Sequence, residues 1–386
     1  FSRFGNCIMA VERIEVKPAI IQWMFDRTGQ HPEQEDAPNW TRMVAGWLEK
    51  PPTLKQLLAA ANSAHIPFDY LLRDEPPPKA VVPLPDMRTV ENREITEPSL
   101  DLLEVIHLCQ WRQEWYKDYL HRTSNASCDF VGSASLEDEP QRVAATIRKL
   151  LQLPLIPPKG TWEQRVKDLT QQAAEKVGVL SMRMSMLGSH HRMLDPEEFR
   201  GFALADDRAP VICINGADSK GAQAFTFAHE FAHLMLGETA LSGSPRPTEE
   251  TSDVEQWCNA VAAEFLVPAD DFLSQDASQV NELVRRYKAS ALVILIRLKT
   301  LNAINRQEFQ QRYDQEKERI EREKKGFSVP HGRRRGQINE ANPLLCRAVI
   351  SSVREGRTTF KEAFSLLRVK NTKALQEVGK LVGAEL

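Results

Sequence analysis

The chain has 386 residues, of which 42% are hydrophobic, a composition that supports ordinary globular cores in roughly two or three domains. Its formal charge of −3 is close to neutral, so no whole-protein field favours nucleic acid or an anionic membrane. The longest apolar run, residues 289–298, is too short to cross a bilayer and contains Arg297. The six cysteines are scattered without a C-x-x-C pair, which favours free thiols in a reducing, cytoplasmic compartment.

Proline-rich and charged segments divide the chain into predicted parts. Prolines cluster at 76–85 and again at 154–158, and residues 316–325 are almost wholly Glu, Lys and Arg. We therefore expect a sequence of five parts: an all-α domain at 9–75, a linker at 76–98, a helical connector at 99–158, a mixed α/β domain at 159–305, and a charged helix followed by a helical C-terminal tail at 306–386.

The first part predicts several short helices. Apolar residues around Ile20 share one helical side, and residues 41–48 predict a second helix. Thr53 is the expected N-cap of a third helix, with Leu54 and Leu57 at core spacing. Several small helices within about 70 residues are typical of a compact helix-turn-helix domain.

The middle of the chain changes from helices to a mixed pattern. Residues 100–121 and 140–151 predict the helices of the connector. Beyond residue 158 we expect a helix at 162–177, strands at 179–186, 200–204 and 210–215, and helices at 222–236, 253–265, 276–287 and 290–301. This order predicts an α+β fold.

Residues 229–233 read His-Glu-Phe-Ala-His, the H-E-x-x-H pattern. Positions i and i+4 of a helix share one face, so His229 and His233 can reach a single divalent cation. Glu230 is then placed to act as a general base on water activated by that cation. Apolar residues surround the pentad, and buried imidazoles and carboxylates are costly unless paired or metal-bound. The pentad predicts a catalytic metal site; the alternative is a helix with two chance histidines.

A catalytic zinc ion usually takes a third protein ligand and keeps a fourth position open. Glu255 follows His233 by 22 residues, on a helix that can return beside the motif helix. Asn259, four residues further on the same face, could support a ligand. Glu264 lies about 180° round the helix from Glu255, so both cannot face the metal. We favour Glu255 and keep Glu264 as the alternative.

These motifs resemble the ImmA/IrrE family of metallopeptidases. The likeness covers roughly residues 160–300 and rests on 225–234, on Glu255, Asn259 and 262–268 after it, and on 200–203 and 210–215 before it. It implies a zincin-like domain, a small sheet plus the HExxH helix, that binds Zn²⁺. The implied ligands are His229, His233 and Glu255, with Glu230 as general base. The implied activity is site-specific cleavage of a partner regulator, often a helix-turn-helix repressor.

The front of the chain is similar to the XRE-type helix-turn-helix domain found fused ahead of this peptidase. The similarity rests on residues 20–29, Trp47, 52–57, 67–72 and 84–89. It departs at 30–39, which carries prolines and acidic residues where a second helix is expected. A recognition helix at about 40–49 would offer Arg42, with Lys50 just beyond it. DNA binding through this domain, and a degenerate module kept for packing or dimerisation, both stay open.

We therefore expect an intracellular zinc endopeptidase that cleaves a specific regulatory protein to control gene expression or a stress or mobile-element response. The alternative is a DNA-binding regulator, or the antitoxin of a toxin pair, whose peptidase fold mainly binds a partner. The intact pentad and Glu255 favour the first. We also expect an extended substrate to pair with the strand at 211–215. No membrane partner is expected, and the sequence leaves the oligomeric state open.

Overall fold

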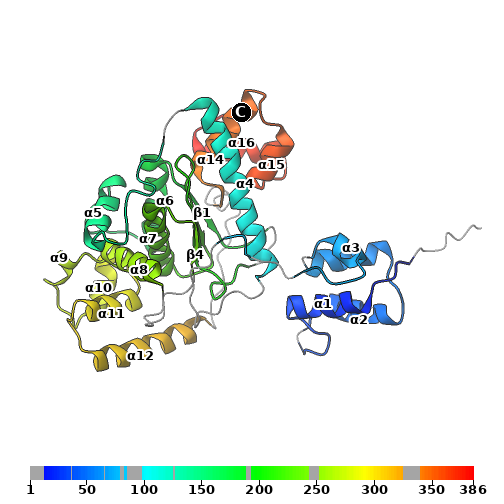
Figure 1. Cartoon of the computed structure of the whole chain (residues 1–386), viewed down its shortest axis with the longest axis horizontal. Helices are drawn as coiled ribbons and strands as arrows, with labels where there is room; N and C mark the ends of the chain where they lie inside the picture. Colours follow the sequence, from blue (N-terminus) through cyan, green and yellow to red (C-terminus); the bar gives the residue numbers. More distant parts are fainter. Residues whose placement is uncertain are drawn as a thin grey trace, which may run out of the picture. The chain divides into compact units, whose positions relative to one another are not determined.

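The computed structural model describes residues 13–35, 37–64, 66–78, 82–84, 98–124, 127–187, 193–242, 252–324 and 340–386. These residues form two compact units. The first holds 13–78 with 98–100, and the second holds 82–84 with 101–386. The predicted fold class, an α+β domain with an all-α N-terminal part and a helical C-terminal region, is confirmed (Figure 1). The finer domain boundaries stay predictions.

The described part of the first unit consists of short helices. These are α1 (Pro18–Thr28), α2 (Asn39–Ala45), η1 (Gly46–Leu48), α3 (Leu54–Ala64) and η2 (Phe68–Leu72). They pack around a small apolar core that includes Ile20, Val44 and Leu57. Thr53 caps α3 as predicted, because its Oγ1 accepts a hydrogen bond from the Gln56 N–H at 3.3 Å. The Gln56 side chain accepts the Thr53 N–H in return, at 2.9 Å, which completes a capping box.

A four-stranded mixed sheet lies at the centre of the second unit. Its strands are β1 (Leu180–Met184), β2 (Gly201–Leu204), β3 (Val211–Asn215) and β4 (Ala240–Ser242), in the order β1-β3-β2-β4. β1 runs parallel to β3, whereas β2 is antiparallel to both β3 and β4. The first three strands fall within the predicted ranges. β4 was missed because three residues are too few to show a periodic pattern.

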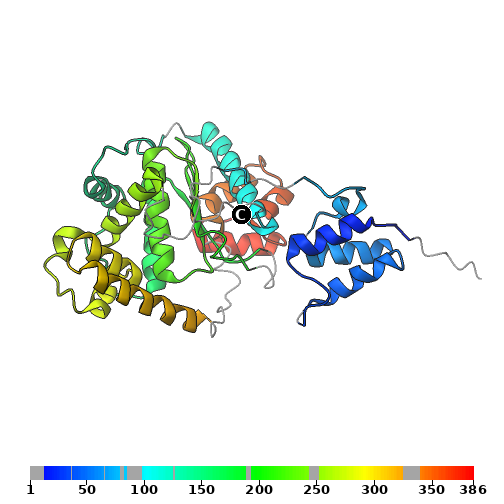
Figure 2. The same ribbon diagram turned by 60° about the horizontal axis from the view of Figure 1, so that its bottom comes forward.

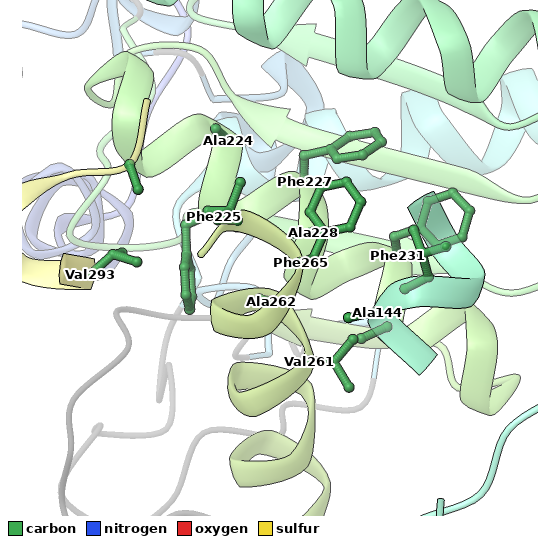
Figure 3. Close-up of a cluster of buried hydrophobic side chains, with 14 of the residues drawn as sticks. Ala144, Ala224, Phe225, Phe227, Ala228, Phe231, Val261, Ala262, Phe265 and Val293 are labelled. Atoms are coloured by element: carbon green, nitrogen blue, oxygen red, sulfur yellow. The ribbon is translucent and has the colours of Figure 1, made fainter. Parts of the chain in front are cut away.

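Helices cover one face of the sheet and enclose the first core of this unit. They are α5 (Pro140–Leu150), α6 (Trp162–Val177), α7 (Lys220–Leu236), α8 (Asp253–Leu266), α9 (Ala269–Phe272), α10 (Val280–Tyr287) and α11 (Ala291–Thr300), followed along the chain by α12 (Arg306–Lys324). Phe227 and Phe231 of α7 and Phe265 of α8 meet in this core (Figure 3). α7 begins after Ser219, whose hydroxyl accepts the Ala222 N–H, and ends at a left-handed glycine.

A second core lies on the other face of the sheet. It joins the strands to α4 (Leu100–Thr123) and to α14 (Pro343–Arg354), α15 (Phe360–Leu367) and α16 (Thr372–Val382). Figures 1 and 2 both show these C-terminal helices beside α4. The buried Arg112 of α4 donates to the carbonyl of Leu366 at 2.9 Å and to that of Glu340 at 2.6 Å. The predicted C-terminal tail is therefore an integral part of the fold.

Two features of the composition can be compared with the structure. The five described cysteines are free thiols, as the scattered spacing predicted. Among the described helices, none combines the length and the apolar character that crossing a bilayer requires.

The second core predicts how two substitutions in the C-terminal helices will differ. Leu366 is 0% exposed, whereas Leu381 on the neighbouring helix is 53% exposed. We expect Leu366→Ala to lower the free energy of unfolding of the second unit by about 2–5 kcal/mol, because it leaves a cavity. Leu381→Ala should change it by less than about 0.5 kcal/mol. Urea unfolding followed by tryptophan fluorescence measures both, and equal losses would contradict a core role for these helices.

Candidate metal centre

Helices α7 and α8 bring three ligand-type side chains to one point. The Nε2 atoms of His229 and His233 lie 3.1 Å apart. Glu255 places Oε1 3.1 Å from His233 Nε2 and Oε2 3.4 Å from His229 Nε2. A tetrahedral zinc ion with ligand bonds of about 2.0–2.1 Å separates its ligand atoms by about 3.3 Å. Within the described residues, this is the group of His, Cys, Asp and Glu side chains that could hold a metal.

Local sequence explains how Glu255 reaches the histidines. Ser252 caps α8, and its hydroxyl accepts the Glu255 N–H at 3.3 Å, so the glutamate falls in the first turn of the helix. Ala228 of α7 and Ala262 of α8 are buried in the shared core (Figure 3). Because these side chains are small, the two helix backbones can approach closely enough for one carboxylate to contact both imidazoles.

Glu264, the alternative ligand, lies elsewhere. Its carboxylate forms a buried ion pair with Arg297 of α11 and accepts the Ala269 N–H at 3.1 Å. These contacts fix the end of α8 against α11 and leave no carboxylate oxygen for a metal. The structure thus brings Glu255, and not Glu264, to the two histidines.

Glu230 faces a small pocket beside the three ligand-type residues. The pocket has room for about one water molecule. Its lining consists of Arg200, Phe225, Thr226, His229, Glu230, Ser242, Glu255 and Asn259. Burial raises the pKa of Glu230 to about 8, and the nearby carboxylate of Glu255 adds to the shift while His229 opposes it. Neither carboxylate oxygen of Glu230 accepts a hydrogen bond from the described part of the chain.

Gly201 allows β2 to approach α7 at this pocket. A Cβ atom at this position would lie 2.5 Å from Thr226 Cγ2, 2.8 Å from the carbonyl oxygen of Cys213 and 3.0 Å from Glu230 Oε1. The carbonyl belongs to the backbone of β3 and cannot rotate away as a side chain would. Sequence reasoning missed this role, since a glycine inside a strand was its only sign.

The chemistry of the three side chains fits zinc. Burial opposes ionisation of Glu255, but His229 and His233 together hold the pKa of this carboxyl well below its usual range. Two imidazole nitrogens and an ionised carboxylate are the ligands of a common zinc site. The Nδ1 atoms of both histidines and the hydroxyl of Ser242 are buried without a partner among the described residues. Such orphaned polar atoms are expected where a fold holds water, an ion or a ligand.

The strand predicted to pair with substrate is an inner strand. β3 is hydrogen-bonded to β1 on one side and to β2 on the other, so its backbone has no free edge. The expectation that a substrate adds to residues 211–215 is therefore wrong. Its continuous apolar sequence is typical of a strand covered on both faces, but that pattern does not show whether a neighbouring strand occupies each edge. Within the described residues β4 is an edge strand, and its Ser242 lines the pocket.

A small mixed sheet, an HExxH helix and a buried His-His-Glu group fit the zincin-like fold and its metal site. Residues 151–299 match the peptidase family model described as the IrrE N-terminal-like domain, so the resemblance predicted for this region is confirmed. Residues 343–380 match a domain of unknown function.

Whole-chain comparisons add little to these matches. No curated protein matches the chain. A solved structure, a Mycobacterium tuberculosis transcriptional regulator, is similar at 14% identity and a TM-score of 0.26, over 48% of this chain and 51% of that one. The chain thus matches about half the length of that protein.

The metal centre predicts different outcomes for substitution of Glu255, which belongs to it, and of Glu264, which does not. We expect wild type to bind about one Zn²⁺ per chain. Glu255→Gln should weaken binding by more than about 100-fold, since loss of a supporting residue alone costs about 10–100-fold. Glu264→Gln should keep the wild-type zinc affinity while lowering stability, because Arg297 loses its anionic partner. Chelator competition, on protein shown to be folded by circular dichroism, measures both. The reverse order of affinities would contradict the assignment.

The close approach at Gly201 predicts a steric effect. Gly201→Ala should lower the free energy of unfolding by about 1–3 kcal/mol, because the new methyl group overpacks the contact between β2 and α7. Gly160→Ala is the matched control, since its Cβ would meet only the Gln164 side chain at 3.9 Å. Denaturant unfolding compares the two variants. An unaffected Gly201→Ala protein would show that the strand can shift away without cost.

Proposed function

We propose that this chain is a zinc-dependent endopeptidase that cleaves a specific regulatory protein, such as a helix-turn-helix repressor, to control gene expression. The observation that carries the proposal is the convergence of His229, His233 and Glu255 beside the buried carboxylate of Glu230. The match of residues 151–299 to a peptidase family supports it. A helix with two chance histidines would instead bury its polar groups against hydrogen-bonding partners, as native cores do.

His229, His233 and Glu255 would hold the zinc ion and leave one coordination position open. When bound, zinc supplies a Lewis acid that polarises a peptide carbonyl and lowers the pKa of water. Glu230 accepts a proton from the attacking water and later gives it to the leaving amine. The small pocket has room for about one water molecule beside this carboxylate.

Substrate recognition is proposed for the edge of the sheet at β4. An extended peptide can add to an exposed strand edge through main-chain hydrogen bonds, with alternate side chains entering neighbouring pockets. Among the described residues β4 is hydrogen-bonded to β2 on one side only, and Ser242 at its end lines the pocket that contains Glu230. A peptide held along β4 would therefore pass the catalytic carboxylate. The three residues of β4 are buried, so a peptide would first have to displace whatever covers this edge. This mode requires an extended segment in the target, such as an interdomain linker.

The alternative function is a regulator or antitoxin whose peptidase fold mainly binds a partner. Such a protein needs the surface of the domain but not the carboxylate of Glu230. The two functions therefore differ in one measurable property, which is whether binding of the partner is followed by cleavage.

We expect wild-type protein with zinc to cut its target, tested first with the product of the neighbouring gene, at one discrete position. Glu230→Gln should reduce the rate by at least about 100-fold, because it removes the general base while keeping the size of the side chain. Glu238→Gln, an exposed position just after the motif helix, is the matched control and should cut normally. Gel electrophoresis and mass spectrometry of the products measure this. Binding without cleavage by wild type would favour the alternative function.

A further inference from the structure

The C-terminal helices contain a helix-turn-helix arrangement. α15 and α16 are joined by residues 368–371 only. The turn begins with Arg368 in the left-handed region, at φ 52°. It ends with Asn371, whose side chain caps α16 by accepting the Ala374 N–H at 3.0 Å. Two helices joined by a tight turn of this length, with α14 packed against both, match the helix-turn-helix pattern.

Positive charge is concentrated in this part of the chain. Residues 343–386 contain eight Lys or Arg and four Asp or Glu, in a chain whose formal charge is −3. Residues 13–78, where the sequence predicted a DNA-binding domain, contain seven Lys or Arg and nine Asp or Glu. An excess of basic residues on a small helical unit is the electrostatic footprint of nucleic-acid binding. The balance of basic and acidic residues therefore favours DNA binding by the C-terminal helices and not by the N-terminal unit.

The outward face of α16 presents side chains suited to base edges. Lys373, Gln376 and Lys380 are exposed and follow one another at helical spacing, so they form one row. Lysine pairs with guanine and glutamine with adenine in the major groove. The row has no aromatic or aliphatic side chain, unlike the centre of a typical protein–protein interface.

Two further lysines flank this row. Lys370 lies in the turn before α16, and Lys361 lies in the first turn of α15, and both are exposed. Within the described residues, neither of them, nor Lys373 or Lys380, forms an ion pair. Their charges are therefore available to phosphates. The opposite side of α16, through Leu375 and Val378, is buried in the second core, so the outward side is the one available to a partner. Besides the row, that side carries the half-buried Glu377 and the exposed Leu381.

We propose that α14, α15 and α16 bind duplex DNA, with α16 as the recognition helix in the major groove and Lys361 and Lys370 against the phosphate backbone. This docking follows the general geometry of helix-turn-helix proteins, in which the second helix reads bases and the first crosses the backbone. The inference does not rest on peptidase activity. It places a DNA-binding surface in the same compact unit as the metal centre, which would hold the protein near DNA-bound regulators.

The test uses the full chain and a fluorescein-labelled, random-sequence duplex of about 30 base pairs, roughly three helical turns. Fluorescence anisotropy gives the affinity across a salt series. One variant combines Lys370→Gln, Lys373→Gln and Lys380→Gln. The matched control combines Arg42→Gln, Lys50→Gln and Lys55→Gln, which removes the same charge from exposed positions of the N-terminal unit. Zinc binding by both variants checks that the second unit is folded.

We expect the C-terminal variant to lose at least about ten-fold in affinity at about 0.1 M salt. The slope of log affinity against log salt should fall by about 0.9 for each phosphate contact removed. The control variant should bind like wild type. No binding by wild type at about 50 mM salt would overturn the proposal, as would an equal or larger loss in the control. Tighter, lysine-dependent binding of RNA of the same length would overturn the assignment to DNA.

Discussion

Burial of ionisable side chains between α7, α8 and the edge of the sheet is the constraint on which this structure depends. Two imidazoles and two carboxylates lie where unpaired charge is expensive. Glu255 offsets that cost by contacting both histidines, whereas neither carboxylate oxygen of Glu230 accepts a hydrogen bond of ordinary geometry among the described residues. A fold gains nothing in stability from such a carboxylate. This burial supports the proposal that Glu230 acts on water in a reaction.

The surrounding elements serve this arrangement by bringing backbones close together. Gly201 brings β2 against the motif helix, and alanines let α8 approach from the other side. The buried ion pair of Glu264 and Arg297 attaches the C-terminal end of α8 to α11. Because α8 is one continuous helix, this attachment also helps to hold its first turn, which carries Glu255, in position. The phenylalanines of α7 supply the apolar burial that compensates for the polar centre (Figure 3).

Sequence patterns predicted the elements well wherever they were long or periodic. The HExxH spacing placed His229 and His233 on one face, and the half-turn argument separated Glu255 from Glu264. Short elements and long-range contacts were beyond such patterns. β4 is three residues long, and the approach of Gly201 to Glu230 joins residues 29 positions apart. The substrate strand was misplaced because an apolar run shows that a strand is buried, but not which strands flank it.

The C-terminal helices show why a pattern that predicts a helix does not predict its role. Their apolar residues have the periodicity of any amphipathic helix, and the sequence alone gave no partner for that face. The second core supplies the partner, since Leu375 and Val378 are buried in the cluster that also contains α14 and α15. Because that face is buried, the side of α16 that carries the lysine row is the side that faces solvent. Packing in the second core therefore determines which side chains a DNA duplex would meet, and it places them in the unit that carries the metal centre.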